Sequence, residues 1–196
     1  AVMTDRVKRH VNLPVGINLL ANGAVPAIAV AAVTGGVFVR VNQWANAYVA
    51  NEGLMEGQAA RATRYRAWLR ARGVRIFADV HVKHGSHAIV ADRSIAELTR
   101  DVEFFDADVV IATGQRTGDA AQVDEVTAIK AATQLPVVIG SGVNDDNVGD
   151  LLQVADGVII GSSLKEDGVW WTPVSEAKVT RFMDKVNRLR NGREGR

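Results

Sequence analysis

The sequence predicts an α/β protein of the TIM (β/α)8-barrel type, and two observations lead to this fold class. First, short continuous apolar segments alternate with helical segments along the chain, which is typical of parallel strands that are buried on both faces. Second, polar residues follow one apolar segment after another. Strand ends that converge in this way are typical of a barrel mouth, whereas an open sheet has its site at one switch point. We expect one domain over residues 1–196.

The strands are predicted where four to eight apolar residues stand between turn residues. In chain order they are 14–20, 37–42, the segment that starts at 76, 108–114, 135–140 and 156–161. No Gly-x-Gly-x-x-Gly follows the first strand and no Walker lysine motif occurs, so the two common nucleotide-binding loops are not indicated.

The helices are predicted from apolar residues at helical spacing and from their end signals. In chain order they are 4–11, 24–33, 57–72, 95–105, 123–133, 145–153 and 176–189. Ser94 and Glu97 form a capping-box pattern at one start, Asn144 is a cap for another, and Gly73 ends the third helix. In that third helix we expect the arginines in solvent and Trp68 in the core.

The segment 43–57 is predicted as a long loop that carries Trp44, Tyr48 and Glu52. A loop of this length in a small domain is usually functional or disordered. We interpret it as a lid, with a structural loop packed by its own aromatic residues as the alternative.

Composition limits the classes of function. The chain has 196 residues, of which 47% are hydrophobic, a net charge of +1 and no cysteine. It can therefore form one sizeable core, and it carries no disulfide framework or thiolate chemistry. The charge favours neither nucleic acid nor anionic lipid as a partner. No apolar run is long enough to span a bilayer, and no signal-peptide pattern opens the sequence, so we expect a cytoplasmic protein without an integral membrane segment.

The most informative stretch runs from Ile76 to His84, because it begins as an apolar strand and becomes rich in ionisable groups. Strand side chains alternate between faces, so Asp79, His81 and Lys83 are predicted to share one face. Burying three such groups is costly unless they pair with each other or with a ligand. They are our candidate catalytic residues. The alternative is a structural Asp–Lys pair beside a hydrogen-bonded histidine.

The same stretch allows a metal interpretation, because His84 and His87 follow at three-residue spacing. That spacing places ligands on one face of a helix, but here the chain leaves a strand for a loop. A divalent metal is thus possible and not favoured. We assign no metal ligand, and the cofactor is unknown.

Other strand ends supply candidate binding residues. Asn18, Arg40, Asn42 and Thr113 each lie near the end of an expected strand and are the predicted substrate-binding group. An arginine at the end of a buried strand indicates an anion or a carboxylate as its partner.

Two glycine–serine turns follow successive strands, and they are the candidate phosphate site. They contribute Ser141 with Gly142, and Gly161 with Ser162. The last two loops of a barrel often hold a phosphate, and glycine allows backbone N–H groups to approach an oxyanion closely. The alternative is that these glycines only permit tight turns. Lys165 either adds charge to this pocket or is solvated.

Five segments together resemble the BtpA family, including its SgcQ-type members. They are 14–18, 38–42, 77–84, 139–143 and 156–165, of which Asp-Val-His-Val-Lys-His is the most specific. The resemblance covers essentially the whole chain and implies a TIM-type barrel of the phosphate-binding kind. It also implies additional N-terminal residues with the first two strands, so this chain would be the C-terminal six β/α units of eight. Its edge strands would then be 14–20 and 157–160, with no pairing between them.

The family brings no settled reaction, although cyanobacterial members are linked to photosystem I biogenesis. Our leading hypothesis is an enzyme, of the sugar-phosphate lyase, isomerase or hydrolase type, that acts on a small phosphorylated or anionic metabolite. Asp79 would be general base or metal ligand, His81 a proton shuttle, and Lys83 an electrophilic clamp or Schiff-base amine. The alternatives are a non-catalytic assembly factor for a membrane complex and a degenerate barrel that only binds a metabolite. The sequence leaves a homo-oligomer open.

Overall fold

The protein is built on a curled parallel sheet. The computed structural model describes residues 1–114 and 123–194. Its main sheet has six strands in the order β1-β2-β5-β7-β8-β9, and each neighbouring pair is parallel. The strands are β1 (Gly16–Asn18), β2 (Phe38–Val41), β5 (Arg75–Asp79), β7 (Val109–Ala112), β8 (Val137–Ile139) and β9 (Gly157–Val158). The predicted α/β alternation is therefore confirmed, with strands shorter than the apolar segments suggested.

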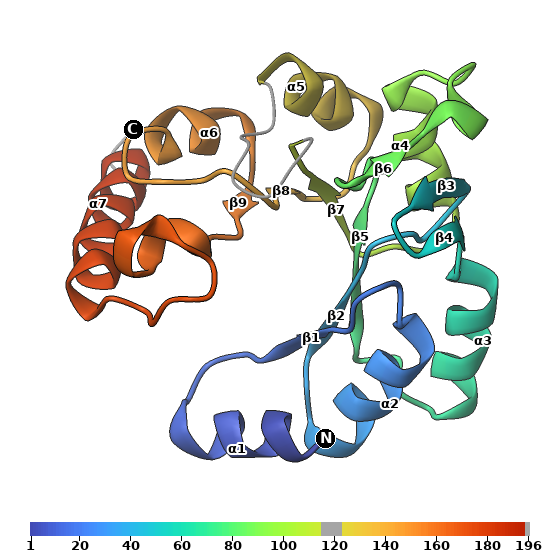
Figure 1. The fold of residues 1–196 in the computed structure, drawn as a ribbon, viewed down its shortest axis with the longest axis horizontal. Helices are drawn as coiled ribbons and strands as arrows, with labels where there is room; N and C mark the ends of the chain where they lie inside the picture. Colours follow the sequence, from blue (N-terminus) through green and yellow to red (C-terminus); the bar gives the residue numbers. More distant parts are fainter. Residues whose placement is uncertain (115–122, 195–196) are drawn as a thin grey trace.

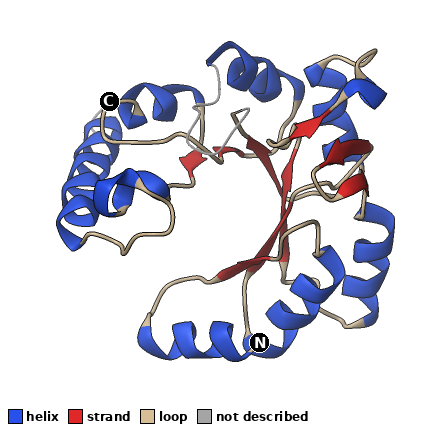
Figure 2. Cartoon of the chain, viewed as in Figure 1, coloured by secondary structure: helices blue, strands red, loops and turns tan. Residues whose placement is uncertain are grey.

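The helices surround the outside of the curve, and the strands line its inside (Figures 1 and 2). In chain order they are α1 (Val2–His10), α2 (Ala24–Thr34), α3 (Ala59–Trp68), α4 (Ile95–Phe104), α5 (Val123–Ala132), α6 (Val148–Val154) and α7 (Glu176–Glu194). Three 3-10 turns complete the list: η1 (Ala88–Val90), η2 (Ser162–Leu164) and η3 (Glu166–Gly168).

The sheet is a partial barrel, open between β1 and β9. These two strands stand at opposite ends of the strand order and do not pair with each other. In Figure 1 the opening lies between α1 and α7. The prediction that these strands form the two edges is confirmed.

The two faces of the sheet differ as strand alternation requires. Val39 and Ile76 point towards the helices and are fully buried. On the inner face Phe38 of β2 stacks on Phe77 of β5, with ring centroids 4.3 Å apart. Gly16 of β1 lies against the ring of Phe38, since a Cβ atom at position 16 would be 2.2 Å from that ring. A side chain at this position would therefore push β1 away from β2.

The predicted lid loop contains regular structure. It forms a hairpin of β3 (Ala47–Ala50) and β4 (Gly53–Glu56), and β3 also pairs with β6 (Gly85–Ser86). Just before the hairpin, Trp44 is fully buried and donates its Nε1–H to the Phe105 carbonyl. The expectation of an irregular loop was wrong, because the hairpin gains its third strand from a segment more than thirty residues away in the sequence.

The helix predictions hold in outline, with three exceptions, of which the first is that α3 ends at Trp68 and not at Gly73. The Ser94 hydroxyl accepts the Glu97 N–H at 3.2 Å, so the predicted cap is confirmed. Asn144 instead caps the turn before α6, which starts only at Val148. Trp68 is 76% exposed, and its predicted place in the core was wrong. It is the last residue of α3, beyond the turns that contain the buried Ala59 and Ala62.

Candidate ligand-binding site

A buried ion pair lies at the carboxyl end of β5. The carboxylate of Asp79 accepts hydrogen bonds from Nε and Nη2 of Arg40, both at 3.0 Å, and from Nδ2 of Asn42 at 3.0 Å. The Asp79 side chain is inaccessible to solvent. Because two nitrogen atoms of one guanidinium and an amide N–H donate to Asp79, this pocket is shaped to hold a carboxylate anion.

Opposing effects act on the protonation of this carboxyl. Burial raises the pKa of Asp79, whereas the Arg40 guanidinium, the Asn42 amide and the more distant Lys83 ammonium lower it. Asn18 of β1 extends the network by donating to the Arg40 carbonyl and to Oδ1 of Asn42. Asp79 therefore connects polar residues at the ends of the three neighbouring strands β1, β2 and β5, directly through Arg40 and Asn42 and indirectly through Asn18.

The predicted phosphate loops surround one cavity. Its volume is about 360 Å³, and its walls come from the loops after β8 and β9, with Lys83 from the segment after β5. The lining includes all four predicted phosphate-binding residues, Ser141, Gly142, Gly161 and Ser162. No hydrogen bond between described residues uses the backbone N–H groups of Gly142, Ser162 or Ser163. We name this the anion cavity.

Hydrogen bonds within and between the two loops build the anion cavity. The Ser163 hydroxyl donates to the Val143 carbonyl at 2.6 Å, and Asn147 Nδ2 donates to the Gly142 carbonyl at 2.8 Å. Gly142 has φ +70°, in the left-handed region that glycine adopts without strain. The Ser163–Val143 bond thus holds the two loops together beside the anion cavity.

Gly140 connects the anion cavity to the ion pair. A methyl group at this position would lie 2.6 Å from Cγ2 of Ile111 and 3.2 Å from Nη2 of Arg40. Glycine therefore permits the close approach of β8 to the guanidinium.

Lys83 stands between two cavities. Its Nζ donates to the Ser141 hydroxyl at 3.3 Å in the anion cavity, and it also lines a second cavity of about 420 Å³. Burial and the nearby Arg40 lower the pKa of Lys83, and Asp79 opposes that change. Lys83 is thus the side chain that both cavities share.

The second cavity, which we name the polar compartment, collects predicted and unpredicted residues. Asn18, Arg40 and Asn42 line it as predicted for a substrate-binding group. Tyr48 and Glu52 of the hairpin segment and Trp170 of the loop before α7 were not predicted as site residues. The sequence feature that could have indicated these site residues is the presence of aromatic residues in two long loops. Lys165 lines neither cavity, because its Nζ donates to the Thr172 carbonyl.

His81 and Thr113 lie elsewhere. β5 ends at Asp79, so strand alternation no longer governs the direction of the His81 side chain. Its ring packs against that of His87, with centroids 3.8 Å apart and the planes tilted by 43°, and its Nδ1 lies 4.0 Å from Oε1 of Glu125, in a separate cavity. The predicted common face of three groups is thus wrong for His81. The buried Thr113 hydroxyl donates to the His81 carbonyl and lines neither of the two cavities.

The histidines do not gather into a recognisable metal site. Among the described residues, no three His, Cys, Asp or Glu side chains are placed to hold an ion. His84 lines the polar compartment, whereas His87 donates its Nε2–H to the Val82 carbonyl, 2.8 Å away. Burial lowers the pKa of both His81 and His87, and it raises that of Glu125.

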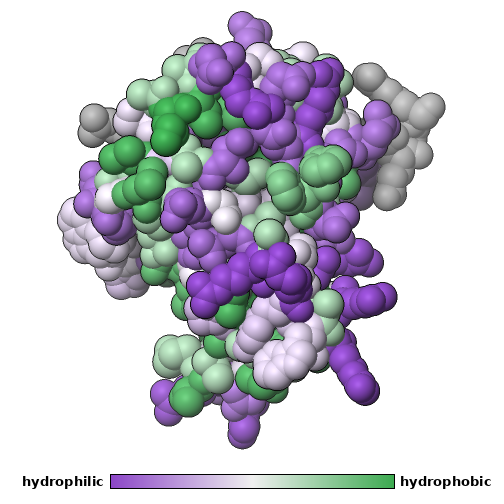
Figure 3. Space-filling view, turned by 90° about the vertical axis from the view of Figure 1, so that its right-hand side faces the viewer, coloured by the Kyte–Doolittle hydropathy of each residue, from purple (hydrophilic) through white to green (hydrophobic). Residues whose placement is uncertain are grey.

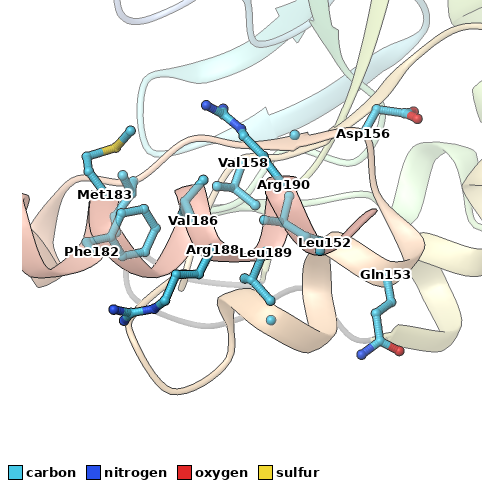
Figure 4. Close-up of a pocket in the computed structure, with 14 residues that line it drawn as sticks. Leu152, Gln153, Asp156, Val158, Phe182, Met183, Val186, Arg188, Leu189 and Arg190 are labelled. Atoms are coloured by element: carbon cyan, nitrogen blue, oxygen red, sulfur yellow. The ribbon is translucent and has the colours of Figure 1, made fainter. Parts of the chain in front are cut away.

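A further hollow lies beside the edge strand β9. It is bounded by α6, α7 and the start of β9, and Figure 4 shows apolar side chains such as Phe182, Val186 and Leu152 on its walls. It contains none of the predicted site residues.

The fold and the site define the class of protein. It is a TIM-barrel-type α/β protein whose polar site is formed by loops at the carboxyl ends of parallel strands. The chain belongs to the BtpA family, whose sequence pattern it matches over residues 1–188.

Two relatives illustrate the breadth of the family. An uncharacterised mitochondrial protein of Caenorhabditis elegans is 36% identical over 189 residues, which are 96% of this chain and 68% of the worm protein. The photosystem I biogenesis protein BtpA of Synechocystis is 38% identical over 184 residues, which are 93% of this chain and 63% of that protein. The resemblance inferred from the sequence is confirmed.

Solved structures support the fold. N-(5'-phosphoribosyl)anthranilate isomerase from Pyrococcus furiosus has a TM-score of 0.64 at 15% identity, over 95% of this chain and 80% of that one. Thiamine phosphate pyrophosphorylase from the same organism has a TM-score of 0.62 at 15% identity, over 94% and 73%. At this identity the likeness concerns the fold alone. Among the described residues, no helix has the length and apolar character needed to cross a membrane.

Proposed function

We propose that this protein binds a small phosphorylated metabolite at the carboxyl end of its sheet, with the phosphate in the anion cavity, and acts on it as an enzyme. The observation that carries the proposal is the convergence of two glycine–serine loops and Lys83 on one cavity. Backbone N–H groups beside glycines, together with a lysine, are the groups that bind phosphate oxygens in proteins.

The names of the structural neighbours agree with this proposal. Both proteins compared above carry a phosphorylated compound in their names. In barrels of this type the last two strand-to-helix loops commonly hold the phosphate, and here those loops follow β8 and β9. The predicted sugar-phosphate character of the substrate stays a proposal.

The test uses inorganic phosphate as the probe. Phosphate at millimolar concentration should raise the melting temperature more than chloride does at equal ionic strength. Ligand linkage gives about 2.7 kcal/mol of stabilisation at a hundredfold excess over the dissociation constant. A melting temperature that does not distinguish phosphate from chloride would refute the proposed site.

A matched pair of variants locates the effect. A Cβ atom at Gly161 meets nothing within 4 Å, so Gly161→Asp can place a carboxylate in the cavity, and Gly161→Asn has the same shape without the charge. Only the aspartate variant should abolish the phosphate response, by repulsion. Gly142 is less suitable, because its φ of +70° would add backbone strain to any substitution.

The catalytic roles differ in the support they receive. Lys83 as an electrophilic clamp is supported by its place in both cavities. Asp79 is better supported as a positioning residue for Arg40 and Asn42 than as a general base, because its oxygens are already engaged. His81 as a proton shuttle receives no support from its position, because it lines a different cavity.

The second candidate is a non-catalytic assembly factor, as the name of the Synechocystis relative suggests for that protein. A surface on α3 favours it. Residues 57–75 contain no Asp or Glu and six arginines. Arg66 and Arg75 pair with Asp108. The other exposed arginines are Arg61, Arg64, Arg70 and Arg72. Trp68 is exposed among them, and Figure 3 shows hydrophilic side chains projecting from the face that carries α3. Such a surface suits an acidic partner.

Two variants separate the candidates in a strain that lacks the protein. An enzyme should fail to complement as Lys83→Met and should tolerate Arg61→Glu with Arg64→Glu. An assembly factor that docks through α3 should show the reverse pattern. Both variants should first be shown to melt cooperatively, so that loss of function is not loss of fold.

A further inference from the structure

We propose that the phosphorylated ligand carries a ketone or aldehyde next to the carbon that bears its phosphate. Nζ of Lys83 forms an imine with the carbon of that carbonyl group. This inference rests on the proposed function. It adds the chemical class of the substrate and a covalent step at a named atom.

The geometry behind this inference is the shared wall of the two cavities. Lys83 is the described residue that lines both the anion cavity and the polar compartment. A ligand whose phosphate lies beside Ser141 and whose carbon chain enters the compartment must pass the lysine. The ammonium is already 3.3 Å from the Ser141 hydroxyl, so the atoms within reach of Nζ are those that join the phosphate to the rest of the ligand.

The surroundings of Lys83 favour a reactive amine over a simple counter-ion. Arg40, the strand-end cation beside it, is bound in two places by Asp79 and cannot itself act as a nucleophile. Burial and the positive charge of Arg40 together lower the pKa of Lys83, which increases the share of neutral amine near pH 7. A lysine that served only as a phosphate clamp would gain nothing from this shift.

The polar compartment also holds groups that can donate and accept the protons that imine formation transfers. Burial, followed by the charges of Glu52 and Asp79, raises the pKa of Tyr48, so its phenol stays protonated. Tyr48 and Glu52 both line the compartment with Lys83. A phenol can donate the proton that a departing hydroxyl needs, and a carboxylate can take up the proton that the ammonium releases.

The step balances without any further reactant. The ammonium of Lys83 loses a proton, its nitrogen lone pair forms a C–N bond to the carbonyl carbon, and the carbonyl oxygen takes up a proton. The nitrogen of this carbinolamine then gives up a second proton, its hydroxyl takes up a proton and leaves as water, and the nitrogen lone pair forms the C=N bond. The net change joins one carbonyl and one ammonium into an iminium and releases one water molecule.

Borohydride trapping of the intact chain tests the inference. The probe is dihydroxyacetone phosphate, which has a ketone adjacent to its phosphate-bearing carbon. Borohydride delivers hydride to an iminium carbon and leaves a stable secondary amine, which peptide mass mapping assigns to a lysine. We expect Lys83 to be labelled faster than Lys165 by at least about tenfold, because binding places its amine beside the carbonyl.

Two control compounds and two variants accompany the probe. Dihydroxyacetone lacks the phosphate and should label Lys83 no faster than Lys165. Glycerol 3-phosphate lacks the carbonyl and should suppress labelling of Lys83 by competition. Lys165→Met should keep the Lys83 adduct, because Lys165 lies outside both cavities, whereas Lys83→Met should remove the rapid adduct.

The outcomes separate this inference from the function on which it rests. Labelling spread evenly over the lysines, or labelling of Lys83 that does not depend on phosphate, would overturn the inference. If phosphate raises the melting temperature but Lys83 is not labelled, the anion site stands and the imine is wrong. If Lys83 is labelled while Gly161→Asp changes neither labelling nor the phosphate response, the anion cavity is wrong.

Discussion

The ion pair between Arg40 and Asp79 should be the most sensitive charged contact in the protein. Replacing Asp79 by asparagine removes the negative charge. The Arg40 side chain, which is only 14% exposed, then keeps its positive charge without a partner of opposite charge. Losing one partner of a buried pair costs about 3–5 kcal/mol, because the remaining charge is not compensated. We therefore expect Asp79→Asn to lower the free energy of unfolding by an amount in that range.

The pair between Arg75 and Asp108 is the matched control. It has a similar separation, 2.7 Å against 3.0 Å, but the Arg75 side chain is 66% exposed. Exposed pairs contribute about 0–1 kcal/mol, so Arg75→Met should change stability little. The difference between the two variants then measures the effect of burial.

Equilibrium unfolding in urea provides the measurement, with Asp79→Asn, Arg40→Met and the double variant in one cycle. The double variant should be more stable than the sum of the single losses predicts, by about 2–3 kcal/mol, because it removes both charges. Strict additivity, or a cost for Asp79→Asn no larger than for Arg75→Met, would refute the argument that this pair is a coupled buried unit.

Three further predictions concern other parts of the chain. Trp44→Ala should cost about 3–5 kcal/mol because the ring is fully buried, whereas the exposed Trp68→Ala should stay within about 0.5 kcal/mol in the same urea assay. Gly140→Ala should destabilise by about 1–3 kcal/mol, since its methyl group would overlap Ile111 Cγ2, and Gly161→Ala is the open-space comparison. Burial lowers the folded-state pKa of His81 and His87, so the unfolded chain binds more protons below about pH 6.5 and the melting temperature should fall as pH drops from about 7.5 to 5.5. Glu125, whose pKa burial raises, acts in the opposite direction; a variant with glutamine at both histidines should lose the fall, and an unchanged fall would exclude them as its source.

Much of the fold could be predicted because its signals are local. Continuous apolar strands and the Ser94 cap each act over a few residues. The grouping of Asn18, Arg40 and Asn42 could also be predicted, since parallel strands bring their carboxyl ends to one side of the sheet.

The remaining features depend on contacts between distant segments. Tyr48 and Glu52 reach the polar compartment because β3 pairs with β6, and no local pattern records that pairing. His81 does not lie on the predicted face, because β5 ends two residues earlier at Asp79, whose carboxylate pairs with Arg40. Strand boundaries are decided by such partners as well as by the residues themselves.

The Arg40–Asp79 pair also restricts how the strands can align. β2 and β5 are in register with Arg40 beside Phe77, two residues before Asp79. A slip of one residue would bring Ala78 or Val80 to the guanidinium and leave both charges buried apart, whereas a purely apolar strand end would tolerate the slip more easily. The residues that shape the ligand cavities thus also select one alignment of the sheet, so a mutation that altered ligand preference here would risk a misaligned barrel.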